Sequence, residues 1–237
     1  MTTTTDLSTL YYSQLTEREK RVYIDLLNGL RLRERDIVCS EVINPARVVS
    51  AINLDRPELF FINWLESYRM TRIDGKSIFN FSYLYNREES VALERRIDDY
   101  ARDLPGISIY GKIRALYERL AKTLSYDNAG LRAAVRSPSM FNAVGPLLHK
   151  KAVCEGVSKF ASAVLKRLQV DVSLAVGTHE GVPHAWNVYR HKDGTLAYSD
   201  FTFGIGVWHS CRPYAYFDLT YEEMARDHVF GGLPQEP

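Results

Sequence analysis

The sequence predicts an α+β fold in which one long helix packs against an antiparallel sheet. The first observation is the segment "CEGVSKFASAVLKRL", where apolar residues from Val157 to Leu168 recur at three- and four-residue steps, the pattern of one helix face. The second is the group of three strand-like runs that follows it, "DVSLAVG", "HAWNVYRH" and "TLAYSDFTF". A helix followed by a series of strands is typical of folds in which helices and strands segregate.

The first half of the chain is predicted to be rich in helix, with one hairpin. Thr16 and Glu19 are spaced as a capping box ahead of an apolar stripe, and Asn44, which precedes a proline, marks a second helix start. Asp74-Gly75 lies between the runs "SYRMTRI" and "SIFNFSYLY" and is a strong hairpin signal. Helical spacing then resumes in "EESVALERRIDDYARDL".

Pro105-Gly106 is the clearest break in the sequence and is the expected boundary between two parts. After it, "ISIYGKIRALYERLAKTLSY" is amphipathic, and a loop around "SPS" leads to the helix that begins near Cys154. The expected organisation is a disordered tip at 1–10, a helical and hairpin region at 11–104, a core domain at 105–230 and a tail at 231–237.

The bulk composition excludes several classes of partner. With 46% apolar and 25% charged residues and a net charge of +1, the chain has no bulk attraction to nucleic acid or to an anionic membrane. No run approaches the roughly 20 apolar residues of a membrane span, and "MTTTTDLSTL" has no signal-peptide pattern. Three scattered cysteines do not form a disulfide framework or a zinc ribbon. We therefore expect a cytoplasmic protein, with non-standard export left open.

Cys154 lies at the start of the helix, where it could be a small buried hydrophobe or a reactive thiolate. The partial positive charge of a helix N-terminus favours an anion by about 0.3–1 kcal/mol. Lys150 and Lys151 would act in the same direction, whereas Glu155 would oppose them. A cysteine nucleophile also needs a base and a group that orients the base.

His184 in "PHAWNVY" and Asp200 in "LAYSDFT" are the candidates for these two roles. Between them, "KDG" is typical of a three-residue hairpin loop that ends with a left-handed glycine. Such a loop pairs His191 with Thr195 and places His184 opposite Thr202. Asp200 is then the diagonal neighbour of His184 on the same face, roughly 7–8 Å away between backbones. A two-residue loop would turn Asp200 to the other face.

The motifs "AVCEG" opening a helix, "HAWN" on a strand and "DFT" after a hairpin resemble the transglutaminase-like cysteine enzyme superfamily, in the same order. The resemblance covers about 109–230, and "YYSQLTEREKRVY" and "RPELFF" are more weakly similar to the leading segment of bacterial members. It implies a papain-like transglutaminase core in the expected core domain, with Cys154 as nucleophile, His184 as general base and then acid, and Asp200 as orienter of the imidazole. The implied reaction is acyl transfer through a thioester, ending in capture by an amine or by water.

The remaining site residues are less well defined by the sequence. Asn142 is one candidate for the second oxyanion donor. Trp186 and Asn187 are candidate substrate or oxyanion contacts, although an indole packed beneath the site and an amide that holds a loop fit them better. The histidines lack metal-ligand spacing with carboxylates or cysteines, and no acidic loop has calcium-site spacing, so no metal and no cofactor are expected.

Three functions remain open at this point. The first is an enzyme that crosslinks, deamidates or cleaves a protein or peptide, the outcome depending on the acyl acceptor. The second is a binding module that keeps the triad without using it. The third is an effector in which the region from Leu10 to Leu104 flanks the cleft and sets substrate choice. The sequence gives neither the substrate nor the oligomeric state.

Overall fold

The computed structural model describes residues 6–41, 43–66 and 68–233. These belong to two compact units, Met1–Ser90 with Gly232–Pro237 and Val91–Gly231. The division falls inside a helix, ahead of the Pro105-Gly106 break. The tip expected at 1–10 and the tail expected at 231–237 lie partly outside the described residues.

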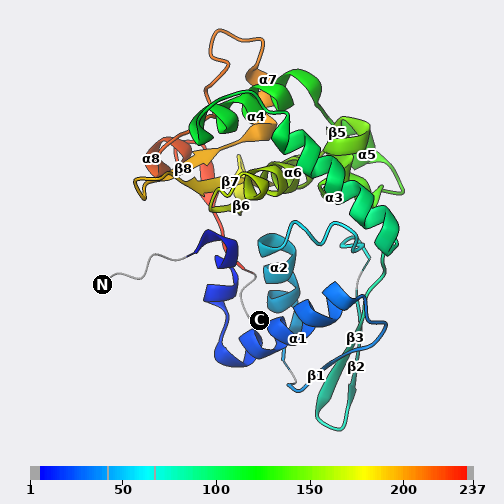
Figure 1. The fold of residues 1–237 in the computed structure, drawn as a ribbon. Coiled ribbons are helices and arrows are strands. Elements are labelled where there is room, and N and C mark those ends of the chain that lie inside the picture. The colour runs from blue at the N-terminus through cyan, green and yellow to red at the C-terminus, as the bar shows by residue number, and fades with distance from the viewer. Residues whose placement is uncertain (1–5, 42, 67, 234–237) are drawn as a thin grey trace. The chain divides into compact units, whose positions relative to one another are not determined.

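The first unit combines helices with a three-stranded sheet of order β1-β3-β2 (Figure 1). The capping box is present, because the Thr16 hydroxyl accepts a hydrogen bond from the Glu19 amide and the Glu19 carboxylate accepts one from the Thr16 amide. Asn44 caps the second helix through the Ala46 amide. Asp74 has a φ of 48° and Gly75 one of 73°, as a tight hairpin requires. The elements are η1 (Leu7–Thr9), η2 (Tyr12–Gln14), α1 (Glu17–Leu32), β1 (Ile37–Cys39), α2 (Pro45–Asp55), β2 (Arg69–Ile73) and β3 (Lys76–Asn80).

The second unit has the expected α+β arrangement of a helix on an antiparallel sheet. Its main sheet has the order β8-β7-β6-β9, with every neighbouring pair antiparallel. Helix α6 packs against β6 and β7, and α4 packs against α7 (Figure 1). Its helices are α3 (Arg87–Arg102, which spans the division), α4 (Ile109–Thr123), α5 (Asn128–Arg132), η3 (Pro138–Phe141), η4 (Gly145–His149), α6 (Cys154–Arg167), α7 (Phe201–Val207) and α8 (Tyr221–Met224). Its strands are β4 (Ser125–Tyr126), β5 (Lys151–Ala152), β6 (Val172–His179), β7 (Val182–Arg190), β8 (Leu196–Ser199) and β9 (His228–Phe230).

The expected strand "TLAYSDFTF" is wrong in its second half. Strand β8 ends at Ser199, and α7 begins at Phe201. The cause is Asp200, whose carboxylate accepts hydrogen bonds from the amides of Thr202 and Phe203 and so caps a helix. Strand β9 and the parallel pair β4–β5 were not expected, because strands of two or three residues carry no readable periodicity.

Buried polar side chains fix α6 on the sheet. Asn187 on β7 donates from Nδ2 to the Ser158 carbonyl oxygen at 3.0 Å and to Ser162 Oγ at 2.8 Å. Ser158 Oγ donates to the Ala185 carbonyl oxygen at 3.0 Å. These bonds join the middle of α6 to the strand that carries His184, so the relative position of helix and strand is set by paired polar groups as well as by apolar packing.

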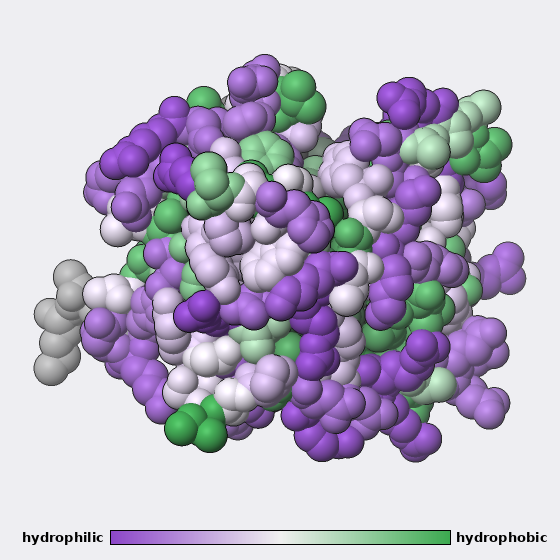
Figure 2. All heavy atoms as spheres, turned by 90° about the horizontal axis from the view of Figure 1, so that it is seen from above, coloured by the Kyte–Doolittle hydropathy of each residue, from purple (hydrophilic) through white to green (hydrophobic). Residues whose placement is uncertain are grey.

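Among the described residues, none of the helices combines the length and the apolar character needed to cross a membrane. The face seen in Figure 2 is mostly hydrophilic, with hydrophobic side chains scattered among the polar ones. Exposed large apolar residues, such as Ile24 in the first unit and Val135 in the second, are a normal feature of a protein surface when they occur singly.

Candidate active site

Helix α6 begins at Cys154, which is half-buried. Two of the charged residues that were expected to influence the thiol form ion pairs. Lys151 pairs with Asp127 at 3.1 Å. Glu155 pairs at 2.6 Å with Lys159, whose side chain is only 2% exposed. The expected opposition of Glu155 and assistance of Lys151 are therefore both reduced. The helix N-terminus, the histidine and Lys150 are left as the main influences on the thiol.

The loop between β7 and β8 has the length that joins His184 to Asp200. The His191 amide donates to the Thr195 carbonyl oxygen at 2.9 Å, and Gly194 has a φ of 91°. Asn187 pairs with Ser199, which is the register of a three-residue loop. His184 Nε2 consequently lies 2.6 Å from Asp200 Oδ2, and the Asp200 side chain is completely buried.

The electrostatics of this pair favour a charged imidazole. Burial alone would raise the pKa of the Asp200 carboxyl, but hydrogen bonds from His184 and His228 outweigh it and lower that pKa. Burial alone would lower the pKa of His184, but hydrogen bonds with Asp200 and with the Cys154 thiol raise it to about 10. Since Nε2 is committed to Asp200, Nδ1 is the ring nitrogen left for the thiol. At neutral pH the geometry thus supports an imidazolium beside the sulfur.

A cavity of about 530 Å³ lies beside the His184 ring. Its wall is largely apolar and includes Val182, Phe203 and Ile205. Tyr126 also lines it, at the end of the short β4–β5 pair that leads to Cys154. Burial, followed by the charge of Cys154 and a hydrogen bond with it, raises the pKa of the Tyr126 hydroxyl to about 12. This tyrosine was not predicted as a site residue, because nothing in the sequence brings it to the thiol.

The other candidate residues take structural positions. The Trp186 indole is fully buried and stacks on the His184 ring, with a centroid distance of 6.0 Å and an interplanar angle of 25°. Both Nδ2 hydrogens of Asn187 are used by α6, so this amide has no donor left for an oxyanion. Asn142 is 2% exposed and accepts from the Val144 amide at 2.8 Å. Its role as an oxyanion donor stays a prediction.

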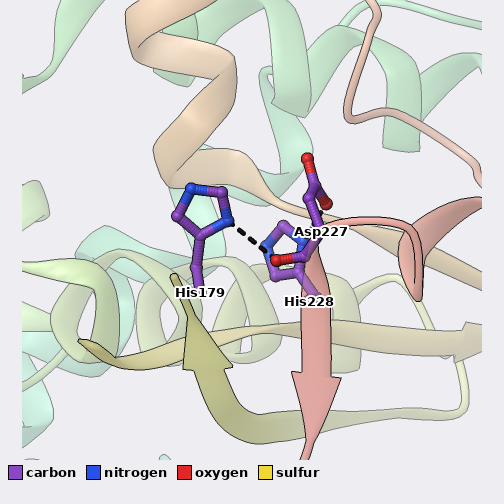
Figure 3. A group of neighbouring side chains, drawn as sticks. All are labelled: His179, Asp227 and His228. Carbon is purple, nitrogen blue, oxygen red and sulfur yellow. Dashed lines mark hydrogen bonds and ion pairs between the residues drawn. The ribbon is translucent and has the colours of Figure 1, made fainter. Parts of the chain in front are cut away.

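The structure also gathers side chains that the sequence spacing did not group. His179 at the end of β6 lies against Asp227 and His228 at the start of β9 (Figure 3), and His228 also reaches Asp200. The donor atoms of His179, Asp227 and His228 lie within 4.8 Å of one another, as do those of His184, Asp200 and His228. Both ring nitrogens of His228 face carboxylate oxygens, so these atoms are arranged for hydrogen bonding.

No family model and no curated protein matches this sequence. The solved structures that are similar to this chain include the following two. One, described as a TGase, is 17% identical, covers 70% of this chain and has a TM-score of 0.44. The other, a protein assigned as a cysteine protease from Cytophaga hutchinsonii, is 11% identical, covers 57% of this chain and has a TM-score of 0.39. The chain spans only 50% and 61% of the lengths of those two proteins.

At such identities and TM-scores the likenesses do not bear on the chemistry. The reaction has to be argued from the side chains of this chain.

Proposed function

We propose that the protein is a transglutaminase-like cysteine enzyme that transfers or hydrolyses the acyl group of a protein or peptide amide. The observation that carries this proposal is the 2.6 Å contact between His184 and the fully buried Asp200, with the imidazole hydrogen-bonded to a thiol at a helix N-terminus. An activated thiol, a base and a group that orients the base are the parts that nucleophilic catalysis requires.

In the proposed first half-reaction, the Cys154 thiolate attacks the carbonyl carbon of the amide. The carbon–nitrogen bond then breaks, and the leaving nitrogen takes the proton that the His184 imidazolium holds, so that ammonia or an amine departs and a thioester remains. In the second half-reaction the neutral imidazole takes a proton from the incoming amine or water, which attacks the thioester and releases the thiolate.

The carbonyl oxygen gains negative charge in both half-reactions and needs hydrogen-bond donors. The backbone amide of Cys154 is one candidate donor. We propose the Tyr126 hydroxyl as the second, in place of Asn142, because Tyr126 lines the cavity and hydrogen-bonds with Cys154. Its raised pKa keeps the hydroxyl protonated at neutral pH, as a donor must be. Tyr126→Phe should then lower kcat by about 100- to 1000-fold, the effect of removing one oxyanion donor.

The apolar wall of the cavity supports a substrate with apolar side chains beside the reacting amide. Mass spectrometry of glutamine peptides, incubated with and without a primary amine, would separate the three chemistries. Amine incorporation means crosslinking, a gain of about one mass unit means deamidation, and fragments mean cleavage. Peptides with Leu or Phe next to the glutamine should react faster than peptides with Asp there.

Chemical labelling gives a matched control for the nucleophile. Cys211 is an exposed free cysteine, whereas Cys39 is buried. Iodoacetamide at pH 7 should modify Cys154 faster than Cys211, and Cys154→Ala should abolish turnover while Cys211→Ala retains it. Equal labelling of the two thiols, together with no product from any peptide, would favour a binding module that keeps the triad without using it.

A further inference from the structure

Asp200 is shared by two histidines. Its Oδ2 atom lies 2.6 Å from His184 Nε2 and 3.1 Å from His228 Nε2, and its Oδ1 atom accepts the amides of Thr202 and Phe203. The His228 side chain is completely buried. Each oxygen of this carboxylate thus makes two contacts, and one of the two contacts of Oδ2 is with a histidine outside the triad.

The second nitrogen of His228 continues the chain of contacts. His228 Nδ1 lies 2.6 Å from Asp227 Oδ1, and Asp227 Oδ2 accepts the Tyr216 hydroxyl at 2.9 Å. The two contacts therefore hold His228 between two carboxylate side chains, with one carboxylate on each ring nitrogen.

The fold holds this histidine rigidly. β9 approaches β6 so closely that the Val229 carbonyl oxygen lies 1.9 Å from where a Cβ on residue 177 would be, and that residue is Gly177. The Trp186 indole contacts His228 edge-on, with a centroid distance of 4.8 Å, while its face stacks on His184. One tryptophan therefore packs against both imidazoles that bind Asp200.

We infer that His228 and Asp227 are positioning residues for the proposed reaction: His228 holds the Asp200 carboxylate through Oδ2, the same oxygen atom that His184 contacts, and Asp227 holds His228. This inference rests on the proposed function for its effect on turnover. His228 and Asp227 do not line the cavity beside His184, and the hydrogen-bonded route from them to the imidazole runs through Asp200.

The His228 ring also lies close to the triad histidine, with its centroid 5.5 Å from that of His184. The titratable groups around His228 are His179 on β6, His184 on β7, Asp200 before α7, Tyr216 in the loop that precedes α8, and Asp227 beside it.

The first test is His228→Gln, which can keep a donor toward Asp200 but loses the ring nitrogen that faces Asp227. We expect kcat to fall by about 10- to 100-fold with an unchanged KM, since the side chain that holds Asp200 is itself no longer held by a carboxylate and no substrate contact changes. His191→Gln is the matched control, because His191 forms a similar 2.8 Å pair with Asp218 away from the triad. An equal loss of activity in the control, or an unchanged kcat in folded His228→Gln, would overturn the inference.

The second test does not depend on turnover. In the Cys154→Ala protein, adding His228→Gln should lower the pKa of His184, measured by NMR, because an Asp200 carboxylate that is held less firmly stabilises the imidazolium less. A merely structural role would leave that pKa in place. If wild-type protein turned over no substrate, the proposed function would fail, and this titration would still decide the role of His228.

Asp227→Asn guards against a His228 variant that does not fold, because the Asp227 side chain is 37% exposed. It removes the anion behind His228, and we expect a loss of kcat of about threefold or more. Full activity in folded Asp227→Asn, combined with an unfolded His228→Gln protein, would limit His228 to a structural role and overturn the inference.

Discussion

Cys154→Ala should lower the pKa of His184 while leaving it above that of a free histidine. In the intact protein burial opposes the protonated ring, whereas hydrogen bonds to Asp200 and to Cys154 favour it strongly enough to raise the pKa to about 10. The substitution removes only the sulfur. The 2.6 Å contact with Asp200 remains, so part of the stabilisation of the imidazolium also remains.

The size of the effect follows from the contact that is lost. A hydrogen bond that involves a charged group is worth about 1.5–3 kcal/mol, and 1.36 kcal/mol corresponds to a change of one in pKa. The pKa of His184 should therefore fall by about 1–2, to about 8–9. It should not reach 6.5, the pKa of an unperturbed histidine, because Asp200 is buried and held in place by two backbone amides.

The same values give the pH dependence of stability. The pKa of His184 is higher in the folded protein than the 6.5 expected when it is unfolded, so its contribution is complete below pH 6.5 and is lost as the pH rises through about 10. The pKa of Asp200 is lowered in the folded protein, so its contribution is present above 3.8, the pKa of an unperturbed aspartate, and is lost as the pH falls. Unfolding in urea between pH 6 and pH 10 should show the first loss, and Cys154→Ala should make it smaller.

Ring-nitrogen NMR during a pH titration is the direct assay, with His184 identified by the signal that disappears in His184→Gln. Cys211→Ala is the control, because it removes an exposed thiol. A pKa of His184 near 6.5 in the wild-type protein, or the same pKa with and without Cys154, would refute the proposed ion pair.

Three further substitutions test other parts of the site. Asp200→Asn should lower kcat by about 10⁴-fold, as a triad with a misoriented imidazole does, and activity equal to wild type would contradict its role as orienter. Asn187→Ala should cost about 2–4 kcal/mol of unfolding free energy in urea because two buried hydrogen bonds to α6 are lost, and a cost below 1 kcal/mol would mean that apolar packing alone holds the helix. Gly177→Ala should lower the Tm because the new Cβ would clash with the Val229 carbonyl. Gly206→Ala is the control and should not lower the Tm, because nothing lies within 4 Å of a Cβ at that position. Equal Tm values for the two variants would show that β9 can move away without a cost in stability.

Local signals in the sequence were sufficient to predict the parts of the fold that depend on neighbouring residues. The capping box at Thr16 and Glu19 and the hairpin at Asp74-Gly75 form as expected, because each is decided within a few residues. The hairpin loop that ends at Gly194 is likewise decided by neighbouring residues. Its length sets the strand register, and the register brings His184 and Asp200 together although they are 16 positions apart.

The parts that were missed depend on contacts across the fold. α7 was read as strand because "DFTF" alternates in the same way as the residues before it, and only the capping bonds of Asp200 turn the chain into a helix. β9 has three residues and pairs with β6 through the space that Gly177 leaves open. Nothing near Asp227 and His228 in the sequence indicates that this strand reaches a carboxylate 28 positions earlier.

Asp200 shows why a carboxylate at this position can serve both the fold and the proposed chemistry. Its Oδ1 atom satisfies the first amides of α7, and its Oδ2 atom binds His184 and His228, so each oxygen has a separate task. Since the capping bonds fix the orientation of the carboxylate, they also fix the direction from which the imidazole is held. Asparagine at this position could still cap the helix through its Oδ1 atom but would present an amide to the two histidines. Loss of activity in Asp200→Asn with little loss of stability would therefore separate the two tasks of one side chain.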